Sequence, residues 1–231
     1  MAFFLYLTTK TQIMIRTLSF AAALSLFTAR SQSIETVDSL TYEFCDFLKE
    51  SQLSDKKKFE VLNDELIIPY LRKLKNADPE QVYQQIFFRM QRNCLELILL
   101  LERLDPRSEE KERLVEKPKT QLTKAQIEEF KKIKKFYYLE SDGVKTKVEV
   151  KDGKWLDKFK DKSFSKLHMR WIEEAEFELE FIESNNITRK NLSIPGDKYN
   201  YQVISKEDKF YWMSYNVPGQ ANYTKFKLYF K

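Results

Sequence analysis

Apolar residues in segment 34–50 recur every three or four positions, which is the spacing of one buried face of an α-helix. Segments 54–74 and 79–104 repeat this spacing, and an Asp-Pro pair bounds the third segment on each side. Pro69 should break or kink the second segment because proline lacks a backbone N–H. The pattern predicts three helices that pack as a small bundle.

After residue 133 the apolar period changes to two, which is the alternation of half-buried strands. Turn signals separate the runs, and they contain all four glycines of the chain. We therefore expect an α+β protein whose C-terminal half is an antiparallel β-meander of about eight strands, either a curled sheet or a lipocalin-like barrel. The turn signals are Asp142-Gly143, Asp152-Gly153, Asn185-Asn186, Pro195-Gly196 and Pro218-Gly219.

The composition between the two halves predicts a charged linker, because Lys, Glu and Arg dominate it and apolar residues are few. The expected organisation is an N-terminal extension and signal peptide at 1–31, a helical domain at 32–106, a charged linker at 107–122 and an antiparallel β domain at 123–231.

The stretch MIRTLSFAAALSLFTARSQS has the plan of a secretory signal peptide: Arg16, then an apolar run, then small and polar residues. The uncharged run 17–29 is too short for a spanning helix, which needs roughly 20 residues. Small residues at Ala29 and Ser31 place cleavage before Gln32. The stretch predicts export to the periplasm or the medium without a stable membrane span after cleavage. A helix of the fold is the alternative interpretation.

Removal of the leader changes the charge of the protein. The leader holds three basic residues and no acid, so the formal charge falls from +5 to +2. A nearly balanced chain offers little field for neutralising phosphates. We therefore expect no nucleic-acid partner.

The chain has two cysteines, Cys45 and Cys94, and each lies on or beside the apolar stripe of a predicted helix. They can meet if the first and third helices cross side by side. A disulfide is then expected, since disulfides persist in an oxidising compartment. Two buried free thiols are the alternative.

Four glutamates alternate with apolar residues in the run EEAEFELEFIE. On a strand they share one face at spacings of roughly 7 Å, which falls in the range of a glycosidase carboxyl pair. The alternative is a polar sheet face whose charge is offset by lysines on neighbouring strands. The residues of this candidate acidic face are Glu174, Glu176, Glu178 and Glu180.

Other catalytic signals are sparse. His168 is the single histidine, and its strand phase sets it opposite the apolar face. Zinc-type ligand spacings and glycine-rich phosphate loops do not occur in the sequence. We therefore expect no catalytic residues, no metal site and no cofactor.

Aromatic residues are frequent in the β half, which holds all three tryptophans. They could line a barrel that receives an apolar small molecule, or they could simply fill its interior. The candidate ligand-facing residues are Trp155, Trp171, Tyr211, Trp212 and Tyr215.

Four stretches carry a resemblance to a known group: FFRMQRNC at 87–94, KFYYLESDG at 135–143, MRWIEEAEFELEFIESNN at 169–186 and PGDKYNYQ at 195–202. They resemble exported Bacteroidetes proteins with a signal peptide, a helical N-terminal domain and a small β-rich C-terminal domain. That group has no established activity. Its members often place cysteines where this chain has Ala175 and near Ile127, so the resemblance leaves Cys45–Cys94 as the sole candidate bridge.

These observations predict an exported, non-catalytic protein that acts through binding or structural interaction with a protein or a small apolar ligand. A lipocalin-like carrier is one alternative, and a glutamate-dependent hydrolase is another.

Overall fold

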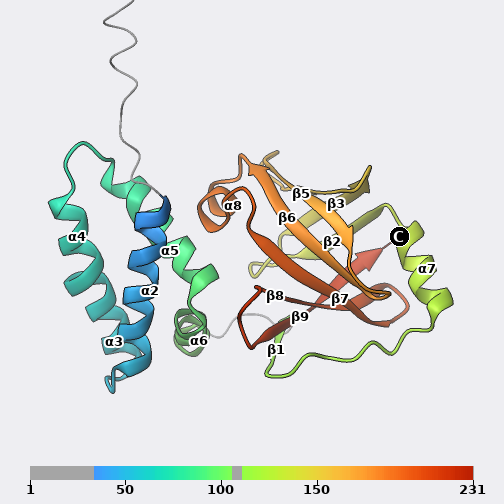
Figure 1. The fold of residues 1–231 in the computed structure, drawn as a ribbon, viewed down its shortest axis with the longest axis horizontal. Helices are drawn as coiled ribbons and strands as arrows, with labels where there is room; N and C mark the ends of the chain where they lie inside the picture. Colours follow the sequence, from blue (N-terminus) through green and yellow to red (C-terminus); the bar gives the residue numbers. More distant parts are fainter. Residues whose placement is uncertain (1–33, 106–110, 231) are drawn as a thin grey trace, which may run out of the picture.

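The computed structural model describes residues 34–105 and 111–230, so the expected leader at 1–31 lies outside the described residues. Helices form one side of the molecule and a β-barrel the other (Figure 1). The fold is therefore α+β, as the sequence predicts.

The helices gather around an apolar core of their own, in which Leu48, Ile86 and Met90 are fully buried. The second predicted helix is not broken at Pro69. A π-helical turn precedes the proline, which sits in the first turn of the next helix, where its missing N–H is not needed. The helices are α2 (Ile34–Glu50), α3 (Asp55–Val61), the π-helical turn η2 (Leu62–Ile67), α4 (Ile68–Lys73), α5 (Pro79–Asn93) and α6 (Leu95–Leu104).

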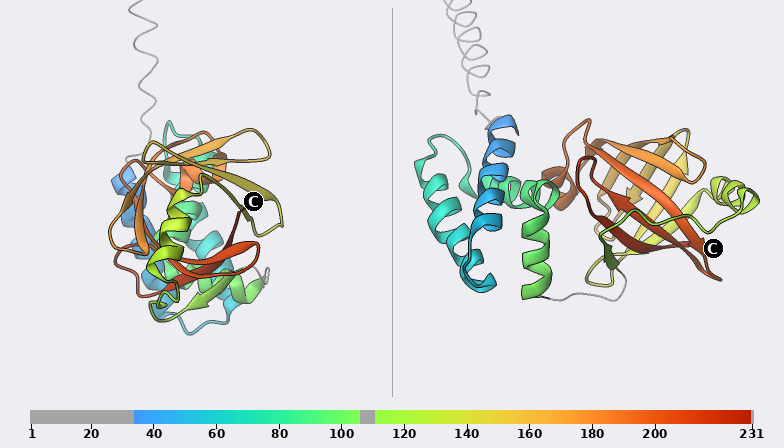
Figure 2. Two further views of the ribbon diagram at one scale, coloured as in Figure 1. Left: turned by 90° about the vertical axis from the view of Figure 1, so that its right-hand side faces the viewer. Right: turned by 60° about the horizontal axis from the view of Figure 1, so that its bottom comes forward.

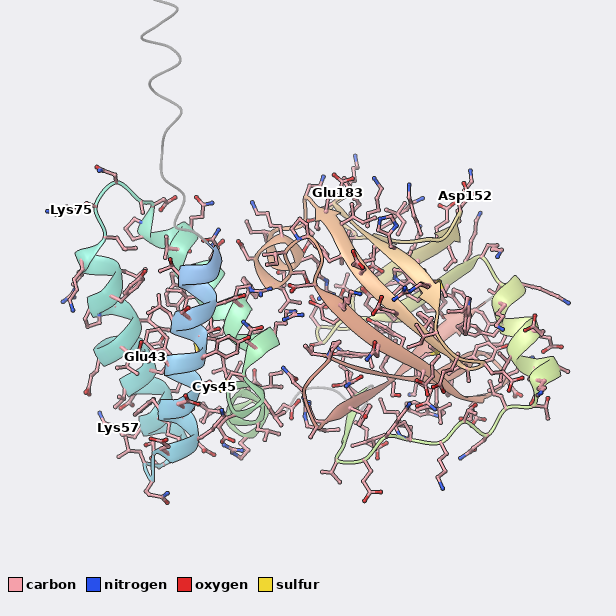
Figure 3. All side chains as sticks on the ribbon, viewed as in Figure 1. Glu43, Cys45, Lys57, Lys75, Asp152 and Glu183 are labelled. Atoms are coloured by element: carbon pink, nitrogen blue, oxygen red, sulfur yellow. A yellow bond between two sulfur atoms is a disulfide. The ribbon has the colours of Figure 1, made fainter. Side chains whose placement is uncertain are left out.

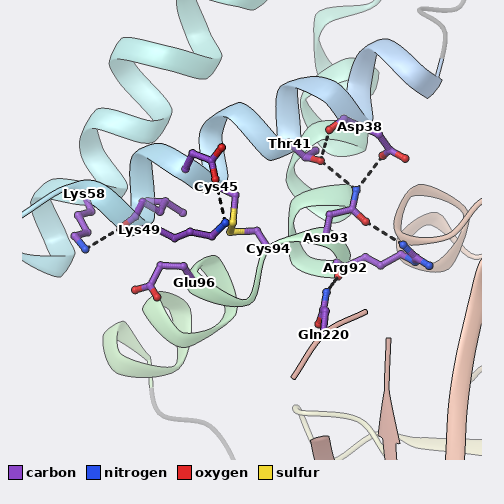
Figure 4. The surroundings of a disulfide bond; sticks show 12 residues. Asp38, Thr41, Cys45, Lys49, Lys58, Arg92, Asn93, Cys94, Glu96 and Gln220 are labelled. Atoms are coloured by element: carbon purple, nitrogen blue, oxygen red, sulfur yellow. Dashed lines mark hydrogen bonds and ion pairs between the residues drawn. A yellow bond between two sulfur atoms is a disulfide. The ribbon is translucent and has the colours of Figure 1, made fainter. Parts of the chain in front are cut away.

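The single helix predicted over 79–104 is in fact two helices, so that prediction is wrong. Cys94 has an extended backbone (φ −123°, ψ 103°) and separates α5 from α6. The preceding Asn93 turns its side chain to α2, where its amide donates to Asp38 Oδ1 at 3.0 Å and to Thr41 Oγ1 at 3.1 Å (Figure 4). Side-chain bonds to another helix thus accompany a break that the apolar period does not reveal.

The disulfide Cys45–Cys94 is present, with the two Cα atoms 5.5 Å apart, and it joins α2 to the α5–α6 break (Figure 4). Both residues are buried. The predicted bridge is confirmed.

Eight antiparallel strands form a closed barrel in which each strand pairs with the next along the chain. The last strand returns to the first through the pairs Phe136–Phe230 and Tyr137–Tyr229 (Figure 2). Of the two predicted alternatives, the barrel is therefore correct. The strands are β2 (Lys135–Leu139), β3 (Lys145–Lys151), β4 (Lys154–Lys158), β5 (Phe164–Trp171), β6 (Glu176–Ser184), β7 (Lys198–Lys206), β8 (Phe210–Asn216) and β9 (Tyr223–Phe230).

The charged segment 107–122, expected as a linker, contributes a strand to the sheet. Strand β1 (Lys111–Leu114) pairs with the first half of β9, beyond the point where β2 pairs with it. The chain then follows the barrel wall, where the Gln121 N–H donates to the Ile204 carbonyl at 2.7 Å. Backbone hydrogen bonds hold β1 and Gln121 against the barrel, and such bonds do not require the apolar alternation by which a strand is recognised in the sequence.

The turns follow the predicted signals except at Asn185-Asn186. Asp152 and Gly153 both have positive φ, 50° and 67°, as a two-residue hairpin turn requires. Asn186 instead caps a short helix, α8 (Ile187–Leu192), through a bond from the Arg189 N–H to its side chain at 3.2 Å.

The helices meet the barrel where α5 packs beside α8 (Figure 1). Arg89 is buried there and bonds both carboxylate oxygens of Asp38 at 2.6 and 2.7 Å. The same guanidinium donates to the Leu192 carbonyl at 3.0 Å and to Asp197, which also pairs with Arg92 at 3.1 Å. An ionic cluster thus ties α2 and α5 to the loop before β7.

Candidate functional site

Helix α7 (Lys124–Lys132) lies across one end of the barrel, at the far side from the other helices (Figures 1 and 2). A capping box starts it: the Gln126 N–H donates to Thr123 Oγ1, and the Thr123 N–H donates to Gln126 Oε1. Ile127 and Phe130 are buried beneath the helix. The Phe130 ring lies edge-on to Tyr211, with the ring centroids 4.9 Å apart. The helix therefore covers this mouth of the barrel with an aromatic plug.

A hollow of about 220 Å³ remains between α7 and the rim of the barrel. Apolar side chains and polar groups share its wall about equally, and two of the three tryptophans are among the apolar side chains. Two lysines stand beside it, and the Lys131 ammonium lies 4.8 Å from the centroid of the Trp171 ring. The hollow is lined by Phe130, Lys131, Ile133, Lys134, Phe136, Val150, Gly153, Trp155, Met169 and Trp171.

Deeper in the barrel, aromatic rings fill the interior. The centroid of Phe177 is 5.9 Å from that of Trp155 and 5.4 Å from that of Tyr201. Tyr201 continues the stack to Tyr215 at 5.5 Å. The hollow at the α7 mouth therefore stands at the entrance to a filled interior. A wider depression of about 460 Å³ lies at the β4–β5 turn and is open to solvent.

A cluster of polar groups occupies the opposite end of the barrel, next to α8. The Arg189 guanidinium donates to Glu140 at 2.7 and 3.0 Å, and Thr146 Oγ1 donates to the same carboxylate at 2.9 Å. Asp157 is buried nearby and accepts a bond from the Trp155 indole N–H at 2.9 Å. The cluster closes this end with internally paired groups.

Burial raises the pKa of the Asp157 carboxyl from 3.8 to about 6, while the Arg189 charge and the Trp155 bond oppose that rise. Sequence reasoning missed this residue. The signal was present, because Asp157 has the same strand phase as the inward-facing Trp155. A carboxyl group at a position where the strand alternation expects an apolar residue indicates a buried polar group.

The five predicted ligand-facing residues divide between the two sides of the barrel wall. Trp155 and Trp171 line the hollow. Tyr211 and Tyr215 face inward and pack with the interior rings. Trp212 points outward, where Lys225 lies over its ring at 4.3 Å. The structure therefore gathers four of the five inside the barrel and leaves Trp212 on the outer wall.

The four glutamates of the candidate acidic face lie on or just before β6, and basic side chains accompany each of them. Glu178 alone contacts two cations. This pairing favours the interpretation as a polar sheet face with offset charge. The ion pairs are Glu174–Lys124 at 3.9 Å, Glu176–Lys117 at 2.6 Å, Glu178–Arg170 at 2.9 Å, Glu178–Lys198 at 3.3 Å and Glu180–Lys198 at 3.6 Å.

His168 is exposed on β5, opposite Lys154 and Glu180 on the adjacent strands. Within residues 34–105 and 111–230, no three His, Cys, Asp or Glu side chains gather closely enough to hold a metal ion. None of the helices in the described part of the chain combines the length and apolar character that crossing a bilayer requires.

Comparison with protein-family models, with curated proteins and with solved structures finds no match to this chain.

Proposed function

We propose that this protein is a non-catalytic binding protein whose barrel takes a small ligand with an apolar ring at the mouth beneath α7. The observation that carries the proposal is the hollow of about 220 Å³ beside Trp155 and Trp171. Ligand sites are typically concave and mostly apolar, with a few polar groups at defined places. The hollow is concave and combines aromatic side chains with lysines at its edge, and it lies at the mouth of a barrel, where such sites recur.

The dimensions of the hollow limit the ligand class. Pockets that bind drug-sized ligands have volumes of about 300–1,000 Å³, so a smaller molecule is expected in this hollow. Trp155, Trp171 and Phe130 favour a flat ring that packs against their side chains. Lys131, which also pairs with Glu128 at 2.8 Å, and Lys134, which also donates to the Lys131 carbonyl at 3.1 Å, lie at the edge and favour a ligand with an acidic substituent. A fused aromatic ring with one acidic group is the ligand class that fits these residues best.

Export is part of the proposal, and the disulfide supports it. Cys45 and Cys94 are bonded inside the helical core, and such bonds persist chiefly in oxidising compartments. The resemblance to exported Bacteroidetes proteins agrees with this assignment. Mass spectrometry of the protein isolated from its own cells should give a chain that starts at Gln32. A reduced chain that starts at Met1 or Met14 would contradict export.

The ligand site is tested by NMR, because the three tryptophans give three separable indole N–H signals. Titration with naphthalene sulfonate should shift the signals of Trp155 and Trp171, which line the hollow. The signal of Trp212, on the outer wall, should stay in place and serves as an internal control. Trp→Phe variants assign each signal.

A filling variant gives the decisive comparison. Val150 lines the hollow, and Val150→Phe adds a ring to that space, so affinity for naphthalene sulfonate should fall at least about tenfold. Far-UV circular dichroism checks that the variant is folded. Shifts confined to Trp212, or equal affinity of a folded Val150→Phe protein, would overturn the site.

A further inference from the structure

Like charges lie directly opposite each other on the outer wall of the barrel. Lys147 on β3 is paired across the strands with Lys158 on β4, and Lys151 is paired with Lys154. Such pairs are destabilising in a sheet. Glu149 offsets one of these lysines through a 2.6 Å bond to Lys158. The acidic residues of this wall therefore offset its positive charge only in part, which leaves lysines available to an acidic partner.

Aromatic rings lie beside these lysines on the same outer wall. Tyr137 and Tyr229 stack with their centroids 4.8 Å apart, and Phe210 links Tyr229 to Trp212 at 5.4 Å on each side. The Lys145 ammonium lies 3.9 Å from the centroid of the Tyr137 ring. We name this surface the aromatic–lysine face; its residues are Tyr137, Lys145, Lys147, Trp212, Lys225 and Tyr229.

The ring contacts distinguish between two classes of acidic partner, single-stranded nucleic acids and anionic lipid surfaces. Proteins that bind single-stranded nucleic acids offer open ring faces on which bases stack. Here Tyr137 is held between Tyr229 and Lys145, and Lys225 lies over Trp212. The faces of these rings are therefore already engaged. The arrangement disfavours base stacking and leaves charge and ring edges as the means of contact.

We propose that the aromatic–lysine face docks on an anionic lipid surface. Trp and Tyr favour the boundary between lipid and water, and lysines keep their ammonium groups at that boundary while their stems cover apolar surface. Lys145 and Lys147 are exposed on the convex wall of the barrel, a shape suited to a broad surface. Glu112 pairs with Lys225 at 2.8 Å and offsets only part of the positive charge. This docking does not depend on the hollow beneath α7.

Sedimentation with lipid vesicles tests the proposal. The protein should bind phosphatidylcholine vesicles that contain about one-third phosphatidylglycerol, and binding should weaken as salt rises because surface charges are screened. Lys145→Gln with Lys147→Gln should weaken binding about 30-fold, since each lysine near an anionic surface contributes about a fivefold gain and the two factors multiply. The matched control is Lys73→Gln with Lys75→Gln, two exposed lysines at the end of α4, and it should bind as the parent does. Lys75 lies on the helical side, away from the barrel (Figure 3).

The fluorescence of Trp212 separates lipid from other polyanions. It should move to shorter wavelength on binding to the anionic vesicles, and the Trp212→Phe protein should lose that change. Three outcomes would overturn the proposal: no sedimentation with the anionic vesicles, equal binding to pure phosphatidylcholine vesicles, or binding to heparin that excludes the vesicles without a change at Trp212. The last outcome would assign the face to soluble polyanions.

Discussion

Arg89 provides the sharpest test of how the helices are joined to the barrel. Its side chain is 2% exposed and bonds Asp38 on α2, the Leu192 carbonyl on α8 and Asp197 before β7. Arg89→Met keeps the length and apolar stem of the side chain but removes the charge. The variant therefore isolates the contribution of the guanidinium.

The stability that Arg89→Met should lose depends on the hydrogen-bond and ion-pair partners that each carboxylate keeps in the variant. Asp197 keeps Arg92 at 3.1 Å and the Ile194 N–H at 2.9 Å, so its charge stays paired. Asp38 keeps the Asn93 amide at 3.0 Å but no cation among the ion pairs of the described residues. Breaking a buried pair costs about 3–5 kcal/mol when one charge is left unpaired. With one partly exposed charge orphaned, we expect about 3 kcal/mol, the lower end of that range.

Urea unfolding measures this loss with two signals that report different parts of the molecule. All three tryptophans lie in the barrel, so fluorescence follows the barrel, whereas the far-UV helix signal is dominated by the other half. Arg89→Met should shift the helix signal to lower urea than the fluorescence, because the ionic cluster no longer couples the two parts. Adding Asp38→Asn should restore much of the loss, since it removes the orphaned charge.

Arg103→Met is the matched control. Arg103 also bonds two carboxylates, Asp55 and Glu96, but its side chain is 44% exposed. Exposed ion pairs contribute about 0–1 kcal/mol, so this variant should lose less than 1 kcal/mol. The reasoning fails if Arg89→Met costs no more than Arg103→Met, or if Asp38→Asn adds a further loss instead of a recovery.

Three further predictions follow from burial and chain connectivity. Burial raises the pKa of Asp157 from 3.8 to about 6, so the folded parent binds more protons than the unfolded chain and loses stability as pH rises through that window. In urea titrations the free energy of unfolding of Asp157→Asn should equal that of the parent at about pH 4 and exceed it by about 3 kcal/mol at neutral pH. Unfolding free energies that change in parallel with pH in the two proteins would contradict the burial argument. Reducing Cys45–Cys94, separated by 49 residues, should lower the unfolding free energy by about 4 kcal/mol from loop entropy, measured with and without reductant. Phe130→Ala should cost about 3–5 kcal/mol in thermal or urea unfolding and enlarge the hollow, so that bulkier ring acids bind in calorimetry when the parent excludes them.

The spacing of apolar residues predicted those helices and strands in which buried residues recur at a regular interval. The stripe of α2 buries Val37, Phe44 and Leu48, and the alternation of β6 buries Phe177, Leu179 and Phe181. The disulfide could be predicted from the sequence for the same reason, because cysteines on two apolar stripes face the same core. These features depend on neighbours three, four or two residues apart, which a sequence displays directly.

Features that depend on residues far apart in the chain could not be predicted from local sequence pattern. Closure of the barrel rests on Phe136 meeting Phe230, and either strand would show the same alternation in an open sheet. Strand β1 has a charged sequence and exists through its backbone bonds to β9. The hollow depends on how far α7 stands from the rim, and the ionic cluster at Arg89 combines residues from three separate elements.

The two ends of the barrel differ in chemistry, and this difference indicates from which end a ligand enters. At one end the helical half is fixed to the barrel by the Arg89 cluster and by Gln220, whose amide donates to the Arg92 carbonyl at 2.5 Å (Figure 4). Polar groups around Arg189 fill that end, and removing them from their partners would leave buried charges unpaired. At the other end α7 is held by apolar packing of Ile127 and Phe130 and by the solvent-exposed ion pair Glu129–Lys206 at 2.8 Å, and neither contact has such a requirement for exact pairing. Because displacement of α7 exposes apolar surface and separates only ion pairs whose side chains already contact solvent, ligand entry beneath α7 is energetically the easier route into this barrel.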